Sequence, residues 1–168
     1  MERLNIVCVD DQQNVLYTLQ RDLTFFQSDL NLSFCESVPE AYQVLEELDA
    51  AGQYIAVVIC DHIMPERNGV DFLIDLKDDE RFCAIKTVLL TGLATHQDTI
   101  RAINQAHIDR YIEKPWDGKK LVDTLKTLLT QFIFDAGLDY LEYAPYLDEK
   151  IVLETLHNPN NIYSNRND

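Results

Sequence analysis

The stretch Ile55-Ala-Val-Val-Ile-Cys-Asp61 decides the fold, because an unbroken apolar run leads directly into a carboxylate. A short run this apolar, and rich in β-branched residues, is typical of a strand that is covered on both faces. In open parallel sheets, groups just beyond the strand ends meet in one crevice, where ligands bind. We therefore expect Ile55–Cys60 to be a central strand and Asp61 to lie in that crevice.

Similar runs alternate with helical patterns along the chain. They are Leu4–Val9, Leu30–Cys35, Thr87–Leu90 and Arg110–Ile112. Between them, apolar residues recur at helical spacing, as in Leu16, Leu19 and Leu23. Alternating strands and helices with short connections predict an α/β fold, in which helices cover both faces of a five-stranded, parallel, doubly wound sheet in three layers.

Capping residues mark where several helices begin and end. Ser37 with Glu40 three residues later forms a capping box, and Asp117 precedes a long last helix. Gly52 is expected to end the helix that Ser37 begins. A further capping box, Thr95-His-Gln-Asp98, predicts a helix that includes Ile100.

Charge and composition exclude several classes of function. The chain carries 29 acidic and 14 basic residues, a formal charge of −15, with no basic stripe for a nucleic acid backbone. No run of about 18 apolar residues is present for a membrane span, and no signal-like segment precedes the first strand. We therefore expect a cytoplasmic protein that binds neither nucleic acid nor membrane.

The cysteines show no metal-binding pattern. Cys8, Cys35, Cys60 and Cys83 lack C-x-x-C spacing. Three of them lie in strand-like runs, so we expect all four to be small buried side chains in a reducing compartment.

Polar groups follow four of the strand-like runs. They are the pair Asp10-Asp11, then Asp61, Thr91 and the step Lys114-Pro115. If these groups share one crevice, it holds three carboxylates, one hydroxyl and one ammonium. Such a set suits a divalent cation and a phosphoryl group.

Over roughly residues 1–134 the chain resembles the receiver domain of two-component response regulators. The resemblance is carried by Asp10-Asp11, Asp61-His-Ile-Met-Pro-Glu-Arg-Asn-Gly69, Leu90-Thr-Gly92 and Tyr111-Ile-Glu-Lys-Pro115. Each motif alone is weak, whereas all of them in order, each after its own strand, are specific. The resemblance implies the flavodoxin-like strand order 2-1-3-4-5.

The resemblance also implies a role for each polar group. Asp61 would be the phosphoacceptor, and Lys114 and Thr91 would contact the phosphoryl group. Mg²⁺ (or Mn²⁺) would be held by Asp10, Asp11, Asp61 and the backbone carbonyl of Ile63.

Other positions would shape and switch the site. The resemblance makes Thr91 and Tyr111 the switch residues. Tyr111 taken alone would more often be an ordinary strand aromatic, but its place three residues before Lys114 favours the switch role. Pro115 would follow a cis bond that aims Lys114 into the crevice, and Gly69 would shape the loop after the phosphoacceptor. His62 is interpreted as a loop residue at the solvent edge. Trp116 either packs under the last helix or marks a partner surface.

The implied function is that of a response regulator in phosphorelay signal transduction. A sensor histidine kinase or a histidine phosphotransfer protein would phosphorylate Asp61, and a downstream output protein or domain would read the change. Apart from its own phosphorylation and dephosphorylation it would not be an enzyme. One alternative is a pseudo-receiver that binds partners without phosphorylation. An aspartyl phosphatase is disfavoured, because Asp10-Asp11-Gln12 lacks the Asp-x-Asp pattern of such enzymes.

The last part of the chain differs in character. We expect residues 135–168 to be a helical extension, with a helix over Asp148–Leu156 and a flexible Asn-rich tail. In a longer protein this tail would be a linker to an output domain. The aromatic residues Tyr140, Tyr143 and Tyr146 suggest exposed apolar area, and hence a homodimer through the extension or through the face around the last strand. The alternative is that the extension folds back onto its own domain.

Overall fold

The computed structural model describes residues 2–92, 97, 100, 104–105 and 107–158. Its centre is a five-stranded parallel sheet in the order β2-β1-β3-β4-β5, which confirms the predicted flavodoxin-like arrangement. The strands are β1 (Asn5–Val9), β2 (Asn31–Cys35), β3 (Ile55–Asp61), β4 (Lys86–Thr91) and β5 (Arg110–Glu113).

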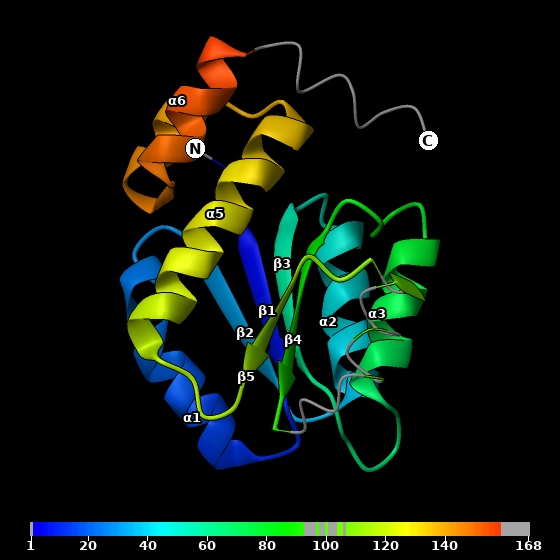
Figure 1. Ribbon diagram of the computed structural model, residues 1–168. Helices are drawn as coiled ribbons and strands as arrows, with labels where there is room; N and C mark the ends of the chain where they lie inside the picture. Colours follow the sequence, from blue (N-terminus) through cyan, green and yellow to red (C-terminus); the bar gives the residue numbers. More distant parts are fainter. Residues whose placement is uncertain (1, 93–96, 98–99, 101–103, 106, 159–168) are drawn as a thin grey trace.

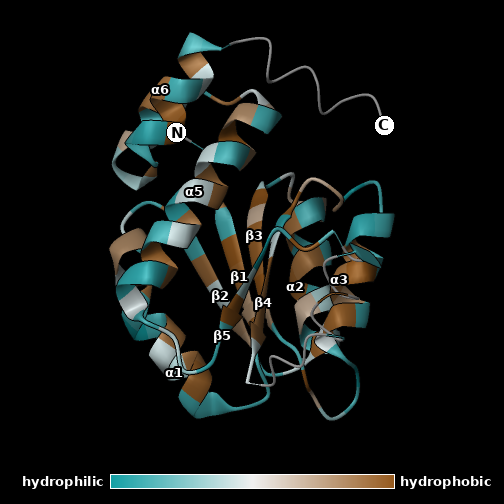
Figure 2. Cartoon of the chain, in the orientation of Figure 1, coloured by the Kyte–Doolittle hydropathy of each residue, from teal (hydrophilic) through white to brown (hydrophobic). Residues whose placement is uncertain are grey.

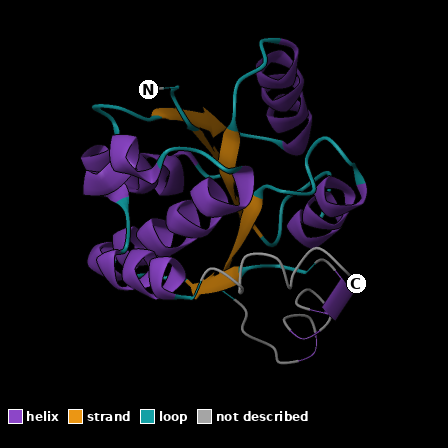
Figure 3. Cartoon of the chain, turned by 90° about the horizontal axis from the view of Figure 1, so that it is seen from above, coloured by secondary structure: helices purple, strands orange, loops and turns teal. Residues whose placement is uncertain are grey.

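Helices cover both faces of the sheet. In the described part of the chain these are α1 (Gln13–Asp22), α2 (Val38–Ala50), α3 (Gly69–Asp78) and α5 (Gly118–Ala136). Helix α6 (Glu149–His157) packs against α5 instead, and η1 (Thr24–Phe26) and η2 (Tyr140–Tyr146) are 3-10 turns. Helices α1 and α5 lie on one face, and α2 and α3 lie on the other (Figures 1 and 3). The helix predicted to open at Thr95-His-Gln-Asp98 falls largely outside the described residues.

The helix ends follow the predicted capping residues. The Ser37 hydroxyl accepts a hydrogen bond from the Glu40 amide at 3.3 Å, and the Asp117 carboxylate accepts one from the Lys120 amide at 2.9 Å. Gly52, with φ of 65°, follows the end of α2 in the left-handed conformation that favours glycine. These local signals therefore set where α2 and α5 begin and where the chain turns back toward β3.

The core consists of two apolar layers, one on each side of the sheet. Side chains such as Leu19 and Leu125 bring α1 and α5 onto one face, and Leu45 and Phe72 bring α2 and α3 onto the other. Every residue of β3 is buried, as its sequence predicts for the central strand. Figure 2 shows the apolar strands enclosed between helices whose polar residues face outward.

The C-terminal extension packs back onto the domain. Tyr143 is 2% exposed, and its hydroxyl donates a 2.7 Å hydrogen bond to the carbonyl oxygen of Glu2. Tyr146 is also buried, and its hydroxyl is hydrogen-bonded to Ser28 and Asp29. The expectation that these tyrosines leave apolar area exposed is therefore wrong, because they complete the layer under α1 and α5. The extension lies beside the N-terminus, at the end of the sheet where the strands begin (Figure 1).

The cysteines are buried with one exception. Cys8, Cys35 and Cys60 lie in the core, where burial raises the pKa of the Cys35 thiol to about 12 and raises those of Cys8 and Cys60 as well. The expectation is wrong for Cys83, which is exposed because it lies in the turns between α3 and β4 rather than in a strand.

In the part of the chain that the structure describes, no helix is both long and apolar enough to cross a membrane.

Candidate functional site

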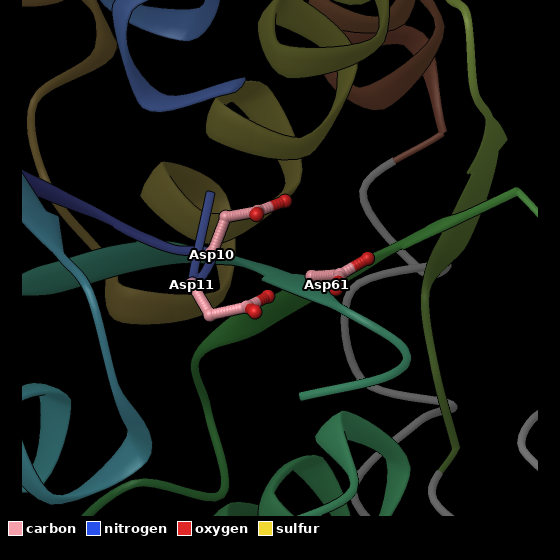
Figure 4. Close-up of side chains that lie close together, drawn as sticks. All are labelled: Asp10, Asp11 and Asp61. Carbon is pink, nitrogen blue, oxygen red and sulfur yellow. The ribbon is translucent and has the colours of Figure 1, made fainter. Parts of the chain in front are cut away.

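Three carboxylates gather at the end of the sheet where the strands finish. Asp10 and Asp11 directly follow β1, and Asp61 is the last residue of the neighbouring β3. One oxygen of each lies within 4.8 Å of the others. The close-up in Figure 4 shows the three side chains together. Asp10 is fully buried, Asp61 is 7% exposed, and Asp11 is exposed. The site is thus open to solvent on the side of Asp11.

Lys114 enters the same site from the end of β5. Its Nζ lies 2.7 Å from Asp10 Oδ2 and 2.8 Å from Asp61 Oδ1. The bond between Lys114 and Pro115 is cis, as the resemblance implied. The ammonium therefore bridges two of the three carboxylates and partly balances their charge.

The electrostatics of this pair follow from burial. Loss of water raises the pKa of the Asp61 carboxyl above its ordinary value, and the hydrogen bond from Lys114 offsets this only in part. Burial alone would lower the pKa of Lys114. Its hydrogen bonds to Asp10 and Asp61 outweigh that effect, so the pKa of Lys114 is raised.

The loop after Asp61 is held close beneath it. The amide of Gly69 donates a 2.8 Å hydrogen bond to the carbonyl of His62, and the Asn68 side chain caps α3 by accepting from the Val70 amide at 2.8 Å. These bonds return the chain to the C-terminal end of β3, so residues 62–69 form a tight loop. Gly69 is therefore at the place where the resemblance expected a loop-shaping residue.

His62 differs from its predicted position. It is 5% exposed, and its Nδ1 lies 3.3 Å from the hydroxyl oxygen of Thr91, so the interpretation as a solvent-edge residue is wrong. The reason lies in the sheet, because the His62 amide still donates to the carbonyl of Leu90 at 2.8 Å. The pairing of β3 with β4 thus continues one residue past Asp61 and draws His62 inside. The apolar run that predicted β3 ends at Cys60 and gave no sign of this.

The remaining predicted positions lie around the rim. Tyr111 is 50% exposed on β5, and the side chain of Ile63 is also exposed. The Trp116 indole donates a 3.0 Å hydrogen bond to Asp22 at the end of α1, and its ring packs against the core between α1 and α5. Of the two alternatives for Trp116, the structure thus shows packing against the domain.

Comparison with known proteins agrees with this geometry. The family model of the response regulator receiver domain matches residues 6–126. The chain belongs to this family. It is accordingly a receiver domain of two-component signalling, a family that acts with histidine kinases and is not an ordinary enzyme family. Its pocket of Asp10, Asp11, Asp61 and Lys114 is consistent with a phosphoacceptor function.

Relatives of this receiver differ in length. The hydrogenase transcriptional regulatory protein HoxA of Cupriavidus necator is 30% identical over 125 residues, which are 74% of this chain and 24% of HoxA. Response regulator Rre1 of Synechocystis is 27% identical over 166 residues, which are 97% of this chain and 69% of Rre1. The chain therefore spans well under two thirds of the HoxA proteins that it matches.

The fold is shared with solved receiver structures. The signal receiver domain of an HD domain-containing protein from Pseudomonas fluorescens has a TM-score of 0.68 and 28% identity, and the match covers 79% of this chain and 90% of that chain.

Proposed function

We propose that this receiver accepts a phosphoryl group on Asp61 from a histidine kinase or a histidine phosphotransfer protein. The observation that carries the proposal is the Asp61 carboxylate at the C-terminal end of β3, with Lys114 Nζ 2.8 Å away. In the transfer, an Asp61 oxygen forms a bond to phosphorus while the bond between phosphorus and the donor imidazole nitrogen breaks. The imidazole leaves neutral after taking a proton, and the product is an acyl phosphate.

Lys114 and Thr91 are the proposed phosphoryl ligands. The Lys114 ammonium already contacts Asp61, so it is within reach of an oxygen on a group attached there. Charge-assisted hydrogen bonds of this kind are about twice as strong as neutral ones. Thr91 ends the adjacent strand β4, and we propose that its hydroxyl donates to another phosphoryl oxygen.

The carboxylates fit a divalent cation. Asp10, Asp11 and Asp61 offer hard oxygen donors within 4.8 Å of one another, which is the ligand type that Mg²⁺ or Mn²⁺ prefers. We propose these residues as its ligands, with the backbone carbonyl of Ile63. When bound, the cation supplies positive charge that offsets the repulsion between a carboxylate nucleophile and an anionic phosphoryl donor.

We propose that phosphorylation changes the conformation of the end of β4 and of β5, and that a downstream partner recognises this change. Thr91 and Tyr111 would be the switch pair, with Tyr111 leaving its exposed position when Thr91 engages the phosphoryl group. Pro115 and Gly69 would hold the backbone that presents Lys114 and Asp61. The reader would be a downstream protein or domain in the cytoplasm. A homodimer through the face that carries Arg110 is a second proposed partner, and nucleic acid and membrane are not proposed.

We propose residues 1–134 as the receiver, with residues 135–168 as an extension that either ends a stand-alone regulator or leads to an output domain. The contacts of Tyr143 with Glu2 support a structural role for the extension in both cases.

Labelling with acetyl phosphate and Mg²⁺, followed by mass spectrometry, tests the proposal. We expect one phosphoryl group per chain on Asp61 and none in Asp61→Asn. Asp78→Asn, which alters an exposed carboxylate at the far end of α3, is the matched control and should be labelled like the parent. No labelling of the parent protein would instead favour the pseudo-receiver, and persistent labelling of Asp61→Asn would rule out Asp61 as the acceptor.

A further inference from the structure

The side chain directly after the phosphoacceptor is buried against the proposed switch threonine. His62 is 5% exposed and Thr91 is fully buried, and Nδ1 of the one lies 3.3 Å from Oγ1 of the other. His62 is also held by its backbone, because its amide donates to Leu90 and its carbonyl accepts from Gly69. The imidazole is therefore fixed in place beside Thr91 by the sheet and by the loop of Asp61.

The surroundings of the imidazole favour one tautomer. Among the residues that the structure describes, Nε2 of His62 has no hydrogen-bond partner, whereas Nδ1 faces the Thr91 hydroxyl. A neutral imidazole carries one N–H, and a buried N–H without a partner is rarer than an unpaired acceptor. The N–H hydrogen therefore belongs on Nδ1, which donates it to Thr91, and Nε2 carries no hydrogen.

This assignment decides what the Thr91 hydroxyl can do. A hydroxyl accepts through its lone pairs and donates through its single hydrogen. A hydrogen bond that Thr91 accepts from Nδ1–H of His62 does not use the hydrogen of the hydroxyl, so His62 does not compete for that hydrogen with a phosphoryl oxygen on Asp61. With the opposite tautomer the hydroxyl would donate to Nδ1, and His62 would compete with the phosphoryl group for that hydrogen.

We propose that His62 is a positioning residue for the phosphorylated state. It donates from Nδ1 to Thr91 and so orients the hydroxyl as the donor to the phosphoryl group. The inference rests on the proposed phosphoryl transfer to Asp61. It adds to that function a residue whose imidazole acts through Thr91. A ligand shifts a two-state equilibrium only through its differential affinity, and here His62 would contribute to that difference.

The tautomer is tested on the unphosphorylated protein. Two-bond nitrogen–proton correlation spectra of the His62 ring, assigned by comparison with His62→Phe, should show the hydrogen on Nδ1. A hydrogen on Nε2 would overturn the proposal even if Asp61 is phosphorylated normally. This readout does not depend on phosphoryl transfer, so it separates failure of this inference from failure of the proposed function.

Beryllofluoride, which mimics a phosphoryl group on a carboxylate, tests the positioning itself. With Mg²⁺ present, His62→Phe should weaken its apparent affinity by roughly three- to tenfold, the effect of one buried hydrogen bond. His62→Asn, whose amide nitrogen can stand near the place of Nδ1, should restore most of the loss. Tighter beryllofluoride binding by His62→Phe, which competition between His62 and the phosphoryl group would give, would refute the proposal. Binding by His62→Asn that is as weak as that of His62→Phe would also refute it.

A double-mutant cycle shows whether the effect passes through Thr91. In a Thr91→Val background, which keeps the shape and removes the hydroxyl, His62→Phe should change the beryllofluoride midpoint little further. An equal loss in both backgrounds would mean that His62 acts by general packing, and would overturn the inference. If the parent protein fails to bind beryllofluoride while acetyl phosphate also leaves Asp61 unlabelled, the proposed function falls and this inference falls with it.

Discussion

Gly69 packs against the backbone of Asp61 so closely that a Cβ on Gly69 would lie 1.8 Å from the Asp61 carbonyl oxygen. The contact is between two pieces of backbone, and neither can rotate away as a side chain can. The loop that follows the phosphoacceptor is thereby pressed against the end of β3. The position of the Asp61 carboxylate thus depends on a residue eight positions further along the chain.

Gly69→Ala is expected to displace this loop and to impair the site. Overpacking of this kind typically costs about 1–3 kcal/mol of unfolding free energy, and a clash with backbone lies at the upper end. Gly92→Ala is the control, because a Cβ there meets no atom within 4 Å among the residues that the structure describes. Urea unfolding and acetyl phosphate labelling measure the two effects. Equal stability and equal labelling of both variants would show that the loop relaxes freely.

The fold was predictable because each of its signals is local. The apolar run of β3, the Ser37 capping box and the Asp117 cap each lie within a few residues, and the structure bears them out. The gathering of Asp10, Asp11 and Asp61 was predictable for the same reason, since each follows its own strand. Parallel strands then bring their ends together, without further information from the sequence.

What the sequence left open depends on contacts between distant residues. His62 is buried because the pairing of β3 with β4 extends past the apolar run, and a polar residue gives no local sign of that. Tyr143 is buried because it meets Glu2, at the other end of the chain. An aromatic side chain in an irregular segment fits an exposed partner surface as well as a covered one, so only the three-dimensional arrangement distinguishes the two.

Lys114→Met should destabilise the metal-free protein. It leaves the buried carboxylates of Asp10 and Asp61 without their cation, and breaking a buried ion pair from one side costs about 3 kcal/mol. Lys119→Met, which alters a largely exposed lysine on α5, should cost far less. Urea unfolding of both variants at neutral pH makes the comparison. A similar small loss of unfolding free energy in both variants would contradict the view that Lys114 balances the negative charge of Asp10 and Asp61.

The pH dependence of this difference has a definite sign. The pKa of Lys114 is raised in the folded protein, so its contribution is fully present below the unfolded pKa and is lost as pH rises through the folded value. Above neutral pH, the difference in unfolding free energy between the parent and Lys114→Met should therefore shrink only when the pH becomes strongly alkaline. The check is to measure the unfolding free energies of both proteins at neutral pH and at pH values above the pKa of an ordinary lysine. A difference between the two proteins that grows with pH would contradict the prediction.

Mg²⁺ should stabilise the parent protein through the three carboxylates. A ligand that binds only the folded state adds about 2.7 kcal/mol at a concentration 100 times its Kd. Asp11→Ala should remove most of this gain, and because Asp11 is exposed the variant should still fold. Thermal unfolding with and without Mg²⁺ measures it, with Asp78→Ala as the control that keeps the full gain. An undiminished gain in Asp11→Ala would place the cation elsewhere.

The C-terminal extension is expected to stabilise the domain rather than to hang from it. Tyr143, Tyr146 and Leu147 are buried in the layer beneath α1 and α5, and each large side chain contributes about 1.5–3 kcal/mol when fully buried. A chain that ends at residue 134 should therefore lose much of the roughly 5–15 kcal/mol that a typical domain possesses. A chain that ends at residue 158, which keeps η2 and α6, should unfold at nearly the same urea concentration as the full chain.

Point substitutions separate this packing from the effect of chain length. Tyr143→Ala removes a side chain that is almost fully buried, and such a change costs about 3–5 kcal/mol. Leu153→Ala removes one that is more than half exposed on α6, so its cost should stay within about 0.5 kcal/mol. If both variants and the chain of 134 residues unfold like the parent, the extension is independent of the receiver. It would then be better described as a linker, whose contacts with Glu2 and Asp29 contribute nothing to the stability of the domain.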